Sequence, residues 1–299
     1  MKIVVAGGSG FIGEPLVARL VSRGNDVAVL TRNRAHVRTG RAVEWEGRNQ
    51  GAWSEEVASA DAIVNLAGEN IAGGRWTEQR KRRLLESRLN ATRAIVEALR
   101  RAPAKPRVLA NASAIGIYGD RGEETVDETS ARGAGFLADL TEQWEAAARE
   151  AEPFARVVLL RFGIVLAASG GALQKMILPF KLGAGGPIGS GEQWMSWVAR
   201  EDALRIIDWT MTNDRARGVY NVTAPEPVRN RDFARALGRA LSRPAILPTP
   251  AFALKIAFGQ MADDALLAGQ RVLPRRALAD GFRFEVSGLD EALARALRD

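Results

Sequence analysis

Two residues that could move a proton lie close together near the middle of the chain. In ASAIGIYGDRG (112–122), Ser113 is followed five residues later by Tyr118, and then by glycine. Hydroxyl groups at the end of an apolar strand are typical of sites that protonate a carbonyl oxygen. A tyrosine does this best when a lysine stands four residues after it, because the ammonium group lowers the pKa of the phenol. We therefore predict Ser113 and Tyr118 as candidate catalytic residues.

The lysine partner is missing. Four residues after Tyr118 stands a glycine, and four after Tyr220, the only other tyrosine, stands an alanine. The stretch ASAIGIYGDRG resembles the active-site strand of short-chain dehydrogenases, and the resemblance implies that the pair would lie on a later helix. That helix reads GFLADLTEQWEAA, with Phe136 roughly at the tyrosine position and Leu140 four residues further on. The Tyr-x-x-x-Lys pair is therefore absent. Tyr118 remains a candidate proton donor only because no tyrosine with a lysine partner is present.

A glycine-rich turn near the N-terminus predicts a cofactor. GGSGFIG (7–13) follows the apolar run KIVVA and precedes apolar residues at helical spacing. Gly7 allows a tight turn, Gly10 lets backbone N–H groups approach a pyrophosphate, and Gly13 lets the helix lie close to the sheet. Because the motif lies between a strand and a helix, it indicates a dinucleotide site.

The second strand indicates which dinucleotide binds. Proteins that bind NAD usually end this strand with a carboxylate that holds the ribose 2′-OH, whereas here it ends Leu30-Thr31-Arg32-Asn33. A guanidinium can pair with a 2′-phosphate, so Arg32 predicts NADP(H). Further cofactor contacts are expected beside the turn and at the carboxyl ends of later strands, at Phe11, Ile12, Thr31, Leu66, Ala67, Gly68, Ala112 and Gly163.

Alternating strand and helix patterns position these residues. Short apolar runs at 2–7, 26–32, 42–45, 60–68, 107–119 and 156–167 alternate with helical segments at 12–23, 77–101 and 137–150. Continuous apolar strands of this kind predict an α/β fold, a Rossmann-type doubly wound parallel sheet. We assign residues 1–166 to the cofactor domain, to which 198–224 returns. Residues 167–299 form a smaller C-terminal substrate lobe that includes the segment 245–299.

Composition excludes several classes of site. The 299 residues include no cysteine and one histidine, His36, so disulfides and thiolate catalysis are excluded and no metal site is expected. The net charge of +7 comes from scattered arginines, and the run QRKRR (79–83) is interpreted as a solvated helix face. We expect a cytoplasmic monomer or homodimer that binds neither nucleic acid nor a membrane, because no apolar run is long enough to span one.

Several blocks resemble a known family. RWTEQRKRRLLESR (75–88), FLADLTEQWEAAA (136–148), RFGIVLAASGGAL (161–173), GGPIGSGEQWMSWV (185–198) and the segment 250–284 are similar to the atypical "epimerase family" branch of the extended short-chain dehydrogenases. The resemblance implies NADP(H) on an extended Rossmann fold and makes the missing Tyr/Lys pair a trait of the branch. Arg88 stands where extended members usually have asparagine, so it is a candidate contact for cofactor phosphates or an acidic substrate, or else a surface charge.

Three functions remain open after these observations. The first is an NADPH-dependent oxidoreductase acting on an unknown small molecule with a substituted acid. The second is a non-catalytic NADP-binding regulatory or interaction protein, and the third is a nucleotide-sugar epimerase or dehydratase. For a substrate pocket we predict Leu166, Gln193, Trp194 and Trp197, since aromatic residues beside a glycine-rich stretch suit ligand binding.

Overall fold

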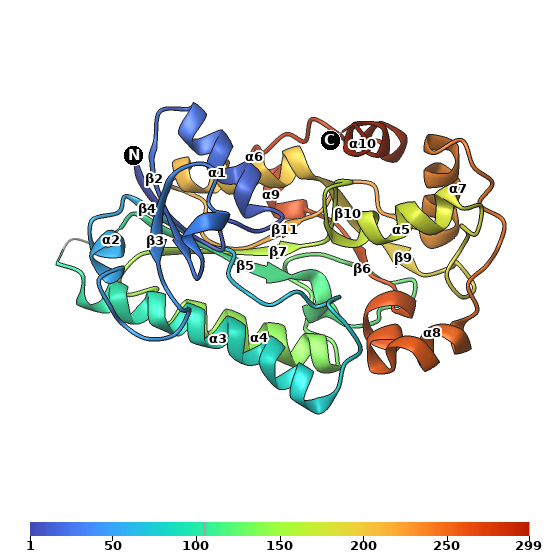
Figure 1. Ribbon diagram of the computed structural model, residues 1–299, viewed down its shortest axis with the longest axis horizontal. Helices are drawn as coiled ribbons and strands as arrows, with labels where there is room; N and C mark the ends of the chain where they lie inside the picture. The colour runs from blue at the N-terminus through green and yellow to red at the C-terminus, as the bar shows by residue number, and fades with distance from the viewer. Residues whose placement is uncertain (104–105, 299) are drawn as a thin grey trace.

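A seven-stranded parallel sheet forms the centre of the computed structural model, which describes residues 1–103 and 106–298 (Figure 1). The strand order is β11-β7-β5-β4-β1-β2-β3, so the chain runs from β1 to one edge and returns through β4 to the other. This doubly wound, Rossmann-type sheet confirms the predicted fold class. Its strands are β1 (Lys2–Ala6), β2 (Asp26–Thr31), β3 (Arg41–Glu44), β4 (Ala62–Asn65), β5 (Val108–Ala114), β7 (Arg156–Phe162) and β11 (Gly218–Val222).

Helices cover both faces of the sheet, and Figure 1 shows them as two layers. One layer contains α1 (Gly13–Ser22) and α6 (Arg200–Thr212), and the other contains α2 (Ser54–Ala58), α3 (Glu78–Arg101) and α4 (Phe136–Arg149). Successive residues of a strand point to opposite faces. Val5 accordingly packs in the core that includes Leu16 of α1, whereas Val4 packs in the core that includes Ile95 of α3.

A smaller lobe follows, built from α5 (Gly171–Lys181), α7 (Asn230–Ala240), α8 (Ala251–Phe258), the π-helix η3 (Ala262–Leu267) and α10 (Leu289–Ala296). In Figure 1, α5, α7 and α8 are grouped at the right of the view. Three two-stranded sheets accompany them: β8 (Ile164–Leu166) with β10 (Trp197–Ala199), β9 (Trp194–Met195) with β12 (Val228–Arg229), and β6 (Thr125–Val126) with β13 (Arg271–Val272). Helix α9 (Arg275–Ala279) packs against β11. No helix in the described part of the chain has the length and apolar character needed to cross a membrane.

Two predicted strands are shorter than the apolar runs that predicted them. The run 156–167 divides at Gly163 into β7 and β8, because the chain leaves the main sheet there to pair with β10. A Cβ at Gly163 would lie 2.4 Å from the carbonyl oxygen of Ser196, so only glycine permits this approach. The run 107–119 ends as a strand at Ala114 and continues as the 3₁₀ helix η2 (Ile115–Tyr118).

Candidate functional site

The glycine turn joins β1 to α1 and requires glycine at its corners. Gly7 has φ +76°, and a Cβ there would lie 2.8 Å from the carbonyl carbon of Leu66. A Cβ on Gly13 would lie 2.2 Å from the carbonyl oxygen of Gly7. The N–H of Gly10 donates to that same oxygen at 3.0 Å and closes the turn. Bare backbone therefore faces the N-terminus of α1, which is the arrangement that receives a pyrophosphate.

The other predicted contacts near this turn differ in exposure. Phe11 and Ile12 are half-buried and pack against the core under α1. The Phe11 ring also lies against the loop before α5, where a Cβ on Gly170 would stand 2.3 Å from it. Ala112 is buried in β5, and Gly163 marks the end of β7. The turn is therefore bordered by the lobe as well as by the sheet.

Arg32 stands at the carboxyl end of β2 with its guanidinium in solvent. Thr31 before it is buried, and its hydroxyl accepts a hydrogen bond from the N–H of Asn33 at 3.2 Å, which shapes the turn. The Arg32 side chain is exposed and makes no hydrogen bond or ion pair with any residue that the structure describes. Its neighbour Arg38, by contrast, pairs with Glu14 at 3.0 Å. An unpaired cation at this position suits a 2′-phosphate.

Arg88 of α3 carries a buried positive charge beside the end of β4. Its side chain is 7% exposed, and one Nη donates to the carbonyl of Leu84 at 2.9 Å. The guanidinium carbon lies 5.1 Å from the ring centre of Trp144, and a Cβ on Gly68 would lie 3.2 Å from the side chain. Within the described residues, its Nε has no hydrogen-bond partner. Burial lowers the pKa of Arg88 to about 10, so it remains a cation at neutral pH.

A buried guanidinium with an unpartnered Nε–H suits an anionic ligand, because burying a charge without a counter-charge costs free energy. Leu66 and Ala67 are half-buried and Gly68 is exposed, so the chain after β4 is open next to Arg88. The glycine turn, Arg32 and Arg88 therefore offer backbone N–H groups and two cations at the carboxyl ends of β1, β2 and β4. The set matches the phosphates of a dinucleotide.

The two candidate catalytic hydroxyl groups are held in a buried network. The Ser113 hydroxyl donates to Glu145 of α4 at 2.6 Å. Glu145 accepts two hydrogen bonds from Arg161 of β7, at 2.7 and 2.9 Å. Arg161 also donates to the Tyr118 oxygen at 2.9 Å, and the Tyr118 hydroxyl donates to Asn221 of β11 at 2.8 Å. Ser113 and Tyr118 therefore belong to one hydrogen-bond network, which lies in the protein interior.

This geometry differs from the expectation that both hydroxyl groups face a substrate. Ser113 is 3% exposed and Tyr118 is fully buried, and burial raises the pKa of the Tyr118 phenol. The residue of β5 that is only partly buried is Ala114, the next residue after Ser113. Because side chains alternate along a strand, the hydroxyl and the exposed position lie on opposite faces. The side chain that is partly exposed at the carboxyl end of β5 is therefore the methyl group of Ala114, and not the Ser113 hydroxyl.

The start of α4 confirms the apolar character expected from its sequence. Phe136 opens the helix, is half-buried and packs edge-on against Trp76, with ring centres 5.1 Å apart. Leu140 is 1% exposed. Both belong to a cluster at the carboxyl ends of β4, β5 and β7, which we call the apolar wall. Its larger side chains are Leu66, Trp76, Phe136, Trp144, Phe162 and Phe258.

The predicted substrate-pocket residues need correction. Leu166 and Trp197 are 1% and 0% exposed and lie in the core of the lobe, because β8 and β10 pair and bury them together. The side-chain amide of Gln193 donates to the carbonyls of Ile188 and Leu266 at 3.1 Å each. It therefore ties loops together instead of facing a pocket.

Trp194 is half-buried and contacts two arginines. The guanidinium carbons of Arg229 and Arg271 lie 4.0 and 4.6 Å from its ring centre. Its indole N–H donates to Glu123 at 3.3 Å. The ring of Trp194 is thus already engaged by cationic side chains. Trp76 and Phe258 of the apolar wall were not predicted as site residues, because their separation in sequence hides their proximity, and Phe136 was noted only as the residue at the tyrosine position.

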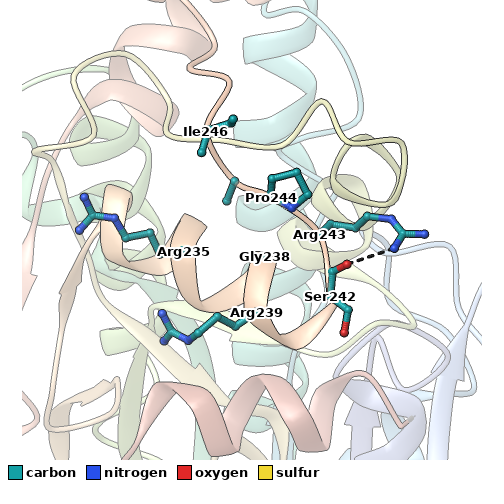
Figure 2. Close-up of a pocket in the computed structure, with 8 residues that line it drawn as sticks. Arg235, Gly238, Arg239, Ser242, Arg243, Pro244 and Ile246 are labelled. Atoms are coloured by element: carbon teal, nitrogen blue, oxygen red, sulfur yellow. Dashed lines mark hydrogen bonds between the residues drawn. The ribbon is translucent and has the colours of Figure 1, made fainter.

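A surface pocket opens elsewhere, at the end of α7 (Figure 2). It is lined by Arg235, Arg239 and Arg243, and Figure 2 shows that the first two point away from the third. Arg235 and Arg239 pair with Asp232 and Asp290, and Arg243 donates to the carbonyl of Lys181 at 3.1 Å. Because these charges are already engaged and no predicted site residue lines it, the pocket is not the candidate active site.

The strand order and the glycine turn define a Rossmann-type dinucleotide-binding fold, and the sequence blocks above resemble the atypical branch of the extended short-chain dehydrogenases, which lacks the Tyr/Lys pair. The model of the NAD dependent epimerase/dehydratase family matches residues 3–223, and a domain of unknown function, DUF1731, matches residues 249–296. The chain therefore belongs to the NAD dependent epimerase/dehydratase family.

Relatives and solved structures match nearly the whole of this chain. The chain is 40% identical over 302 residues to the epimerase family protein YfhF of Bacillus subtilis, covering 100% of this chain and 99% of that protein. The crystal structure of human epimerase family protein SDR39U1 with NADPH matches with a TM-score of 0.90, 36% identity and 100% of both chains. A nucleoside-diphosphate sugar epimerase from Corynebacterium glutamicum matches with a TM-score of 0.80 and 28% identity, over 99% of this chain and 57% of that one.

Proposed function

We propose that this protein is an NADPH-dependent oxidoreductase that acts on a small carbonyl compound. The observation that carries the cofactor assignment is Arg32, an exposed guanidinium without a partner among the described residues, at the end of the strand that follows the glycine turn. The human relative crystallised with NADPH, 36% identical over the whole chain, supports the same cofactor. NADPH, when bound, supplies a hydride.

The chain's own groups would divide the binding among them. Backbone N–H groups of the turn between Gly7 and Gly13 would hold the pyrophosphate, helped by the N-terminus of α1. Arg32 would pair with the 2′-phosphate, as a guanidinium pairs bidentately with phosphate oxygens. Leu66 to Gly68 would border the cofactor. The Nε–H of Arg88, which has no partner among the described residues, would donate to a phosphate or ribose oxygen.

In this proposal Ser113 and Tyr118 position the strand ends and do not donate a proton. Each hydroxyl already donates to a buried acceptor, Glu145 or Asn221. The proton would come from water. A second candidate is a cofactor-binding protein without turnover, which is favoured because the Ser113 and Tyr118 hydroxyl groups are buried and already donate to other side chains. Epimerase chemistry is disfavoured by the missing Tyr/Lys pair.

Turnover separates the two candidates. We expect the purified protein to oxidise NADPH in the presence of at least one compound from a panel of aldehydes, ketones and quinones. Tyr118→Phe should retain the rate within about twofold, since a true general acid contributes about 10²–10⁴-fold. Tight NADPH binding with no oxidation across the panel would favour the non-catalytic candidate, and a 100-fold loss in Tyr118→Phe would restore Tyr118 as the donor.

A further inference from the structure

We propose that the substrate is an apolar, planar carbonyl compound of the quinone type, held against the apolar wall. This inference rests on the proposed function, because it takes NADPH as the reductant. In open α/β sheets, ligands bind at the carboxyl ends of the strands. Leu66 follows β4 there, Ala112 lies near the end of β5 and Phe162 ends β7, three strands that are neighbours in the sheet.

The C-terminal segment completes this wall. Phe258 ends α8, Met261 follows it, and Leu266 lies in η3, and all three pack with Trp76 and the other wall residues. The segment falls within the part of the chain that matches a domain of unknown function. We infer that its role is to give the substrate site an apolar side.

Polar contacts hold the C-terminal segment in place. Arg75 donates to the carbonyl of Ile256 at 3.0 Å, and Lys81 donates to the side chain of Gln260 at 3.0 Å. The backbone N–H of Phe136 donates to Asp264 at 3.2 Å, so η3 caps the helix that carries Phe136. The position of Phe258 is thus fixed relative to α3 and α4, as a binding surface requires.

The indole N–H groups of the wall already have acceptors. The indole N–H of Trp76 donates to the carbonyl of Ile71 at 3.0 Å, and that of Trp144 donates to Thr92 at 3.0 Å. The Lys81 ammonium, 5.7 Å from the Phe136 ring centre, is bound to Glu78 at 2.6 Å as well as to Gln260. The unpaired Nε of Arg88 next to Trp144 offers one donor, so a sugar would leave most of its hydroxyl groups without partners here, which costs free energy for each unpaired group. The rings of Phe136, Phe162 and Phe258, which are half-buried, suit a flat apolar molecule instead, whereas the rings of Trp76 and Trp144 are buried.

The missing proton donor favours a quinone over an ordinary ketone. A ketone that accepts hydride becomes a strongly basic alkoxide, which needs an acid close by. A quinone becomes a hydroquinone anion, whose charge is delocalised over the ring and which takes its proton from water. The reduction consumes two electrons and two protons in total. NADPH supplies the two electrons and one proton as hydride, and water supplies the other proton.

Two phenylalanines of α8 provide a matched test. Phe258 belongs to the wall, whereas Phe252 on the same helix is 68% exposed and is not part of it. Binding of menadione to protein saturated with NADP⁺ can be followed by quenching of tryptophan fluorescence. We expect Phe258→Ala to weaken menadione binding about tenfold, and Phe252→Ala to change it less than twofold. UDP-glucose should not displace menadione.

Separate titrations with NADPH distinguish failure of the quinone proposal from failure of the proposed cofactor function. If NADPH binds but menadione does not, or if both variants lose menadione equally, the quinone proposal is wrong and the proposed cofactor function stands. Displacement of menadione by UDP-glucose would also overturn the quinone proposal. If NADPH itself does not bind, the proposed function fails and the substrate proposal fails with it. Unchanged thermal midpoints and NADPH affinities establish that a lost signal comes from the wall; should Phe258→Ala not fold, Leu266→Ala provides the same test.

Discussion

Replacing Arg161 by methionine is expected to lower the free energy of unfolding by about 3–5 kcal/mol. Arg161 and Glu145 are 7% and 4% exposed, so their charges are compensated by each other and not by water. Burial alone would lower the pKa of Arg161, but its hydrogen bonds and ion pair with Glu145 raise it above the usual value. The variant would leave a buried carboxylate with the Ser113 hydroxyl and a 4.0 Å ion pair with the partly exposed Arg149, and Tyr118 would lose a partner.

Urea denaturation measures this loss, and two controls define its origin. The double variant Arg161→Met, Glu145→Leu removes both charges and should recover at least about half of the loss, because a buried pair is often replaceable by apolar residues. Glu291→Gln, in an exposed pair with Arg295, should change stability by less than about 0.5 kcal/mol. A change of that small size in Arg161→Met would contradict the structural role of the network.

Replacing Gly13 by alanine is expected to weaken NADPH binding by at least about 100-fold. The added Cβ would stand 2.2 Å from the carbonyl oxygen of Gly7 and 2.7 Å from the Cα of Gly8, so the turn must move. A displaced turn loses several hydrogen bonds to charged phosphates, each worth about 1.5–3 kcal/mol. Titration of NADPH fluorescence measures the effect.

Gly288→Ala is the matched control for this variant. Gly288 precedes α10 with φ −88°, and a Cβ there meets no atom within 4 Å. Its NADPH affinity and its thermal midpoint should equal those of the wild type. If Gly13→Ala binds NADPH as well as Gly288→Ala does, the cofactor does not lie on the glycine turn.

The local parts of the site could be predicted from the sequence. Gly7, Gly10 and Gly13 form a motif within seven residues, and its physics depends on one strand and one helix. Arg32 was likewise predicted from the end of a single strand. The absence of the Tyr/Lys pair also follows directly from the residues, and the structure shows Phe136 and Leu140 in an apolar cluster.

The non-local parts could not be predicted in this way. Ser113 and Tyr118 are buried because Glu145, Arg161 and Asn221 converge on them from three later elements. No spacing in the sequence indicates that convergence. The orientation of Ser113 depends on where the strand ends, since a shift of one residue exchanges its face with that of Ala114.

Pairing in the lobe explains the other differences. Trp197 is typical of a binding surface by residue type, but β10 pairs with β8 and places its side chain in the core. Phe258 approaches Trp76 although 181 residues separate them in the chain, and only the fold brings them together. The proposed substrate side of the site therefore depends on long-range packing, whereas the proposed cofactor side depends on local turns.

We propose that the Arg32 guanidinium at the end of β2 selects NADPH. The ratio of the dissociation constants for NADH and NADPH tests this most directly. Titration of the wild type with NADPH and with NADH should show NADPH bound more tightly by about 10- to 100-fold, the worth of a charged hydrogen bond. Arg32→Ala should remove this difference while leaving NADH affinity unchanged. Equal affinities of the wild type for the two cofactors would contradict the account.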